Sequence, residues 1–150
     1  TKKSSTKKSS TKKSSTKKSS TKKRSRPAPP IQKVVVRDSE LHGLGVFATV
    51  DIAEGEVIEL CPYLVIDDDD IAEDNRLNDY LFSSPDEEGD YLVILGSAMM
   101  YNHDDDPNAE WEIDDDDHRF VRFSATRAIS AGEEITQDYG REYWETRSEE

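Results

Sequence analysis

A short polar segment, residues 101–108, holds the side chains that are best placed for chemistry in this sequence. It reads Tyr-Asn-His-Asp-Asp-Asp-Pro-Asn and follows the most apolar run of the chain, Leu92–Leu95. A buried strand followed by Asn, His and Pro puts hydrogen-bonding side chains at the edge of a core, where binding sites are commonly built. The simpler interpretation is an ordinary turn, because Asn and Asp also bond their own backbone.

Two further segments favour the binding-site interpretation. Residues 42–48 read His-Gly-Leu-Gly-Val-Phe-Ala, and residues 132–140 read Gly-Glu-Glu-Ile-Thr-Gln-Asp-Tyr-Gly. One pair of glycines alone is weak, but three motifs in a fixed order and at a fixed spacing are specific. Together with residues 101–108 they resemble the motifs of SET-domain protein-lysine methyltransferases, and the resemblance covers residues 31–147.

Two smaller features narrow the resemblance. Asp79–Ser83 and the pair Tyr143-Trp144 are similar to features of the compact, virus-encoded SET histone methyltransferases, which lack zinc-bound flanking segments. The resemblance implies a mostly β fold of the SET β-clip type, with several short sheets, few short helices and a C-terminal segment threaded through the preceding loop as a pseudoknot. General topology rules would not predict this threading, because threaded chains are rare.

The resemblance also implies an enzyme, a cofactor and a set of site residues. The reaction moves a methyl group from S-adenosylmethionine to a lysine side chain of a basic protein, such as a histone-like tail. Tyr139 is the implied catalytic residue. The implied cofactor-binding residues are Gly43, Leu44, Gly45, Asn102, His103, Tyr139 and Trp144. The implied walls of the substrate channel are Tyr80, Gln137 and Tyr143, and no metal is implied.

The chemistry of methyl transfer suits these residue types. A neutral amine displaces the methyl group in line, so the site must supply alignment and a deprotonated lysine. A free lysine has a pKa of about 10.4, and an apolar channel beside a positive cofactor disfavours its charged form. By the resemblance, Asn102 binds the amino acid end of the cofactor, His103 meets the adenine mainly through its backbone, and Trp144 or Tyr143 covers the adenine.

Three positions depart from the family pattern. Gln137 stands where Phe or Tyr is frequent and where the residue influences how many methyl groups are added, so the product remains open. Leu44 stands where close relatives can carry an aromatic residue, and Asp104 replaces a Ser. The alternative function is a catalytically weak SET-fold module that binds chromatin, with a tail that binds nucleic acid.

A calcium site is the other alternative for the polar segment. Asp104, Asp106 and Asn108 have the alternating spacing that opens a calcium loop. However, Pro107 stands inside the loop, Ala109 replaces the glycine at its sixth position, and the twelfth position is not Glu. His42, His103, His118 and Cys61 are too scattered along the chain to indicate a metal site.

Short strands separated by turns must position these motifs. Alternating or β-branched patterns predict strands at residues 34–36, 57–60, 64–66 and 119–123, the second and third as separate strands around Cys61-Pro62. Helix is predicted near residues 71–81 and 141–147. Residues 48–58 and 125–135 share the pattern Ala-Thr-x-x-Ile-x-x-Gly-Glu-x-Ile, which predicts a strand, a tight turn at the glycine and another strand.

The charge of the chain is divided between two parts. Residues 1–30 hold ten Lys, two Arg and no acidic residue, largely as repeats of Thr-Lys-Lys-Ser-Ser. Residues 31–150 keep eight basic and 33 acidic residues, a net charge of −25. Residues 1–30 lack the apolar groups needed to fold and are predicted to be a disordered tail, whose residues 1–26 could bind nucleic acid. The acidic domain fits a basic substrate, or a protein that works in concentrated salt.

Cysteine content and hydropathy bear on the compartment. Cys61 is the only cysteine, so no disulfide can form within one chain, and a reducing, intracellular setting is expected. The longest apolar stretch falls short of the roughly 20 residues that cross a bilayer, so no membrane association is expected. The family resemblance places the protein at chromatin in a nucleus or nucleoid, otherwise in the cytoplasm. A homodimer remains open.

Overall fold

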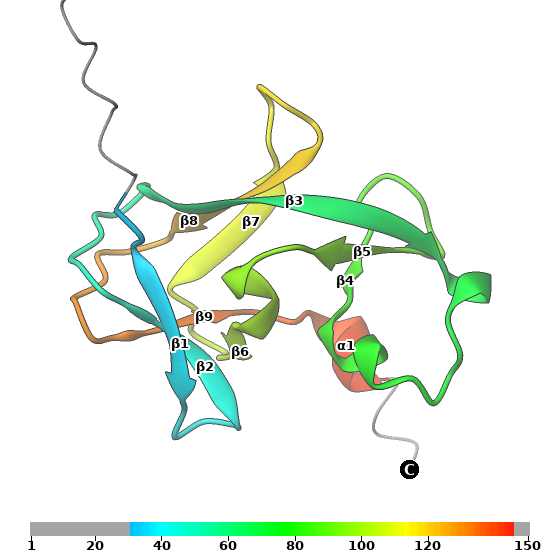
Figure 1. Ribbon diagram of the computed structural model, residues 1–150, viewed down its shortest axis with the longest axis horizontal. Coiled ribbons are helices and arrows are strands. Elements are labelled where there is room, and N and C mark those ends of the chain that lie inside the picture. The colour runs from blue at the N-terminus through cyan, green and yellow to red at the C-terminus, as the bar shows by residue number, and fades with distance from the viewer. Residues whose placement is uncertain (1–30, 146–150) are drawn as a thin grey trace, which may run out of the picture. The chain divides into compact units, whose positions relative to one another are not determined.

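The computed structural model describes residues 31–145, which form two sheets and a few short helices (Figure 1). The predicted basic tail, residues 1–30, and the last two residues of the predicted C-terminal helix lie outside the described residues. The mostly β class is confirmed. No helix within residues 31–145 is long and apolar enough to cross a membrane.

The first sheet carries the predicted site motifs. Its strands, in spatial order, are β1 (Val34–Asp38), β2 (Leu44–Ala48), β9 (Glu134–Gln137) and β6 (Asn102–His103). β9 pairs antiparallel with β2 and parallel with β6. Two motifs far apart in the sequence therefore lie side by side, with Asn102 opposite Thr136 and His103 opposite Gln137. This placement of the C-terminal strand agrees with the predicted threading.

The second sheet supplies most of the core. Its strands, in spatial order, are β4 (Phe82–Ser83), β5 (Asp90–Ile94), β3 (Val57–Asp67), β8 (Phe120–Ala125) and β7 (Ala109–Ile113). Phe82 and Phe123 pack edge to face with 6.0 Å between ring centroids, and Tyr101 meets Phe123 at 5.4 Å. These rings are buried together with apolar residues of the first sheet, such as Val46 and Ile135.

One strand is longer than predicted. Residues 57–67 form a single strand, β3, instead of two runs separated at Cys61-Pro62. Pro62 lies where β3 changes partner, because residues 57–62 pair with β8 and residues 63–67 pair with β5. A proline that lacks its N–H is tolerated at the end of a ladder, so Pro62 does not interrupt the strand.

The helices are short. They are the 3₁₀ helices η1 (Asp68–Asp70), η2 (Arg76–Tyr80) and η3 (Ser97–Met100) and the α-helix α1 (Arg141–Glu145). The prediction of helix over residues 71–81 is therefore wrong except at η2. Asn75 caps η2 by accepting from the backbone N–H of Leu77, but no residue of η2 is buried. Without an apolar face to bury, a longer helix would gain little stability.

The two copies of the internal pattern pair with each other. Ile52 and Ile129 exchange two backbone hydrogen bonds of 2.8 Å. The glycine of each copy donates to the alanine that opens the other, Gly55 to Ala125 and Gly132 to Ala48, both at 2.7 Å. Both glycines have positive φ, which confirms the predicted tight turns. The repeated pattern thus joins the connection from β2 to β3 with the connection from β8 to β9.

Candidate active site

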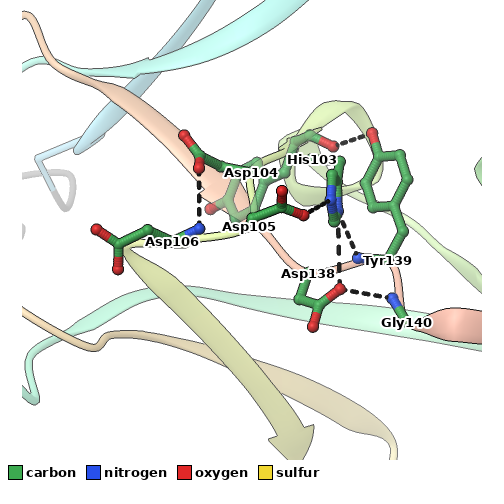
Figure 2. Close-up of polar contacts among 8 residues, drawn as sticks. His103, Asp104, Asp105, Asp106, Asp138, Tyr139 and Gly140 are labelled. Atoms are coloured by element: carbon green, nitrogen blue, oxygen red, sulfur yellow. Dashed lines mark hydrogen bonds and ion pairs between the residues drawn. The ribbon is translucent and has the colours of Figure 1, made fainter.

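Tyr139 follows β9 and is held at both its side chain and its backbone. Its hydroxyl donates to the carbonyl oxygen of Tyr101 at 2.6 Å, and its backbone N–H donates to Nδ1 of His103 at 3.1 Å (Figure 2). Burial raises the pKa of this hydroxyl to about 12, and Tyr143, Tyr80 and Glu134 add to the rise. The phenol is therefore neutral near pH 7, and its proton is directed at a carbonyl.

His103 is fixed in one tautomer by the same contacts. Because Nδ1 accepts a hydrogen bond from the Tyr139 backbone, the ring proton belongs on Nε2. Nε2 lies 3.0 Å from a carboxylate oxygen of Asp105, and Asp138 lies 3.7 Å from Nδ1 (Figure 2). The His103 side chain thus sets the position of the Tyr139 backbone, a role that the sequence did not indicate.

Asn102 stands at the centre of a polar network beside the glycine motif. Its amide nitrogen lies within hydrogen-bond distance of the carbonyl oxygens of His42 (3.1 Å) and Leu44 (3.2 Å). It also donates to Oε1 of Glu134 at 2.8 Å, and the Ser39 hydroxyl lies 2.8 Å from both oxygens of that carboxylate. The network places the predicted cofactor residues Asn102 and Leu44 next to each other.

Gly45 has a structural reason to be glycine. A Cβ at this position would collide with the Glu134 carboxylate and would lie 2.9 Å from the Cβ of Ser39. The packing of β2 against Glu134 and Ser39 therefore requires a glycine at position 45. Gly43, in the turn before β2, has a φ of 46°, which a residue with a side chain rarely adopts.

Asn108 fastens the β6–β7 connection to β9. Its amide nitrogen donates to the carbonyl of Glu134, and its amide oxygen accepts from the backbone N–H of Thr136, both at 2.8 Å. Asn108 is only 2% exposed. Both functional atoms of its amide are used within the protein, so Asn108 is unsuited to the calcium alternative. Within residues 31–145 no group of three or more His, Cys, Asp or Glu could hold a metal ion.

The rings of His103, Tyr139, Tyr143 and Trp144 form one aromatic cluster. The Tyr143 ring lies 4.6 Å from that of Tyr139, and Trp144 stacks nearly parallel to Tyr139 at 6.3 Å. Trp144 also meets His103 edge to face at 5.0 Å. Trp144 is 48% exposed, so α1 presents a broad aromatic surface to solvent beside the catalytic candidate.

A groove is lined by residues of this cluster and of η2. Its lining includes the residues predicted to form the substrate channel, Tyr80, Gln137 and Tyr143, together with Tyr139. Gln137 is 5% exposed, and its side-chain oxygen has no hydrogen-bond partner among the described residues. The charged residues of the lining are mostly acidic and include Asp68, Asp69, Glu73, Asp74, Asp79, Asp138 and Glu145, with Arg76 as a basic residue.

The predicted residues thus form two adjoining groups. Tyr80, Gln137, Tyr139 and Tyr143 line the groove, while Asn102 and Leu44 meet in the polar network and His103 links the two. Sequence reasoning missed four residues that hold these groups in place: Ser39, Tyr101, Asn108 and Glu134. Three of them lie inside or beside the quoted motifs, but nothing in the sequence distinguished them from ordinary strand and turn residues.

Comparison with known proteins gives a consistent picture. Residues 43–140 match the SET domain family. A histone-lysine N-methyltransferase of Schizosaccharomyces pombe, specific for lysine 37 of H3, is 31% identical over 112 residues, which cover 73% of this chain and 74% of that protein.

Two solved structures share the fold. The crystal structure of a candidate histone methyltransferase of Plasmodium falciparum is 33% identical, with a TM-score of 0.61, and the match covers 77% of this chain and 99% of that one. Polycomb Repressive Complex 2 of Chaetomium thermophilum, bound to S-adenosylmethionine, matches with a TM-score of 0.60 and 27% identity. That match covers 80% of this chain and 17% of the other.

Proposed function

This chain belongs to the SET-domain family, and from that premise we propose that it is a protein-lysine methyltransferase that uses S-adenosylmethionine. The observation that carries the proposal is the fixed, neutral hydroxyl of Tyr139. Tyr139 lines a groove together with Tyr80 and Tyr143, and it is bonded to His103, the neighbour of Asn102. This is the arrangement that alignment of an amine with a methyl donor requires.

The residues present fit the cofactor. When bound, S-adenosylmethionine supplies a methyl group activated by a sulfonium. The cofactor also carries an ammonium at its amino acid end, and the Asn102 network gathers the carbonyls of His42 and Leu44 and the Glu134 carboxylate. Such a set of acceptors suits a cationic group. The exposed face of Trp144 suits a flat heterocycle such as adenine.

Tyr139 acts in this proposal as an orienting acceptor. Its proton is engaged by the Tyr101 carbonyl, so the lone pairs of its oxygen remain for the N–H or C–H groups of the reacting partners. A phenol with a pKa of about 12 is a poor general base near pH 7. Deprotonation of the lysine therefore depends on its desolvation among Tyr80, Tyr139 and Tyr143.

The proposed substrate is a basic, histone-like protein. The relatives support this proposal, because one is a histone-lysine N-methyltransferase and another is a candidate histone methyltransferase. The acidic residues that line the groove support the proposed substrate independently, because their negative charge attracts lysine and arginine side chains. We further propose that the protein acts at chromatin and resembles the compact, virus-encoded members of the family.

The test is transfer of labelled methyl groups to a panel of basic proteins. Purified protein is incubated with labelled S-adenosylmethionine and histones, with acidic proteins as a negative panel. Label is expected on lysines of the basic proteins only. A protein that binds the cofactor and the histones yet transfers no label would instead support the catalytically weak chromatin-binding module.

A further inference from the structure

Tyr101 connects the catalytic candidate to the second sheet. Its ring is fully buried, at 0% exposure, and packs edge to face on Phe123. Its carbonyl oxygen accepts the hydrogen bond of the Tyr139 hydroxyl at 2.6 Å. Its own hydroxyl donates to Oε2 of Glu59, on β3, at 2.8 Å. Glu59, Tyr101 and Tyr139 therefore form a row that links β3 to Tyr139, two residues after the end of β9.

Glu59 lies beside the segment that ends at Tyr101. Burial raises the pKa of its carboxyl, and its interactions with the Tyr101 hydroxyl and with Ser97 and Ala98, at the start of η3, oppose the rise. The one hydrogen bond among the described residues that this carboxylate accepts within the distance of a direct contact comes from the Tyr101 hydroxyl.

The hydroxyl of Tyr101 is not needed to fill the core. A phenylalanine would occupy almost the same volume and would bring no polar atom into the interior. A buried hydroxyl such as that of Tyr101 and a half-buried carboxylate such as that of Glu59 are both unfavourable unless they are paired. Since the two groups satisfy each other here, their bond restrains the orientation of Tyr101 more tightly than apolar packing alone would.

We propose that Glu59 and the Tyr101 hydroxyl form a positioning pair, which aims the Tyr101 carbonyl at the catalytic hydroxyl of Tyr139. The inference rests on the proposed function for its catalytic consequence. The Tyr139 backbone has its own anchor in His103, so loss of the pair frees the hydroxyl end of the ring and leaves the backbone end in place. The effect falls on alignment during transfer, because Glu59 and the Tyr101 hydroxyl lie outside the Asn102 network and the groove lining.

Two near-isosteric variants break the pair from opposite ends. Tyr101→Phe removes the hydroxyl, and Glu59→Gln removes the charge of its acceptor. Both are expected to lower kcat by about tenfold, because small misplacements of reacting groups cost that much or more. The KM for a histone peptide and the Kd for S-adenosylmethionine should stay within about twofold of wild type. The double variant should lose no more than the worse single variant, since both remove the same bond.

Tyr63→Phe is the matched control. The Tyr63 hydroxyl also donates to an acceptor within the protein, the carbonyl oxygen of His118 at 2.7 Å, but Tyr63 lies outside the groove lining and the Asn102 network. This variant should retain wild-type kcat. A kcat of Tyr101→Phe within about twofold of wild type, or a loss that appears in KM alone, would overturn the proposal. If Glu59→Gln does not fold, the kcat and KM of Tyr101→Phe alone decide whether the proposal holds.

A second readout does not depend on activity. In protein with ¹³C-labelled tyrosine rings, the Tyr139 resonance is identified by its loss in Tyr139→Phe. It should shift in Tyr101→Phe and in Glu59→Gln and stay unchanged in Tyr63→Phe. If the wild-type chain transfers no methyl group but this shift is seen, the proposed function fails and the positioning of Tyr139 stands. An unmoved resonance in both variants would overturn the positioning pair.

Discussion

The two sides of Tyr139 differ in how completely the protein satisfies its own polar groups. On the side of β2 and β6, Asn102 and Asn108 are buried and their amides are bonded to carbonyls, a carboxylate and a backbone N–H. On the groove side, the Gln137 oxygen is buried without a partner among the described residues, and η2 buries none of its residues. The side proposed for the cofactor therefore holds buried amides in internal hydrogen bonds, whereas the side proposed for the peptide contains a buried amide oxygen without such a bond.

Removing the hydroxyl on which both sides converge should have the largest effect. Tyr139→Phe is expected to lower kcat by at least about 100-fold, since it removes the oriented acceptor and keeps the ring. The Kd for S-adenosylmethionine should stay within about threefold, as measured by calorimetry. Transfer at half the wild-type rate would mean that Tyr139 is not the catalytic residue.

Asn102→Ala tests the side of β2 and β6. The variant removes the amide nitrogen that lies near the carbonyls of His42 and Leu44, and it leaves the Glu134 carboxylate with the Ser39 hydroxyl as its donor. Cofactor binding should weaken by about 1–3 kcal/mol, or roughly 5- to 150-fold in Kd. The matched control is Asn78→Ala on the groove side, where the amide nitrogen also donates to two carbonyls, those of Ala72 and Glu73. Calorimetry should find the cofactor Kd of the control unchanged.

Gln137→Met tests the groove side of Tyr139. The change replaces a buried amide, whose oxygen lacks a partner among the described residues, with an apolar side chain of similar length. The free energy of unfolding should therefore stay the same or rise by up to about 1 kcal/mol, which thermal unfolding would show as an equal or slightly higher midpoint temperature. The matched variant Asn108→Leu should instead destabilise, since it leaves the Glu134 carbonyl and the Thr136 N–H unpaired. Equal destabilisation by both variants would remove the contrast between the two sides.

The basic tail provides the smallest expected effect. The second lysine of each repeat, Lys3, Lys8, Lys13 and Lys18, follows a lysine and precedes a serine, a context that resembles histone tails. We propose that these lysines compete with other basic substrates. Deleting residues 1–26 should raise activity on a basic peptide at low salt by roughly twofold. Mass spectrometry of the intact protein given cofactor should find methyl groups on the four lysines. An unmodified tail and an unchanged KM after deletion would favour nucleic-acid binding.

The sequence predicted the residues that line the groove better than the residues that hold them in place. Tyr80, Gln137, Tyr139 and Tyr143 were identified from motifs, and all four line the groove. The Ser39 to Glu134 bond joins residues 95 positions apart and leaves no local pattern. The Glu59 to Tyr101 bond was missed for the same reason. Contacts of this kind depend on register between strands, which neither residue reveals alone.

The prediction of secondary structure failed where local sequence signals competed with pairing partners that are distant in the sequence. Pro62 suggested a break, yet β3 continues because β5 takes over the pairing that β8 leaves. Residues 71–81 carried enough apolar residues to suggest a helix, yet η2 has no core to pack against. In both places the outcome was decided by neighbours that the local pattern does not specify.

The pairing of the two repeated segments also constrains how the chain folds. Ile52 and Ile129 can exchange their hydrogen bonds only after the strands between them, β3 to β8, have been brought together. Loop closure over such a distance is entropically unfavourable, and domains dominated by non-local pairs fold on a scale of roughly milliseconds to seconds. β9 begins at the end of the second segment, so Tyr139 should be among the last residues to reach its place. Enzymatic activity would then be acquired at the end of folding, after most of the core has formed.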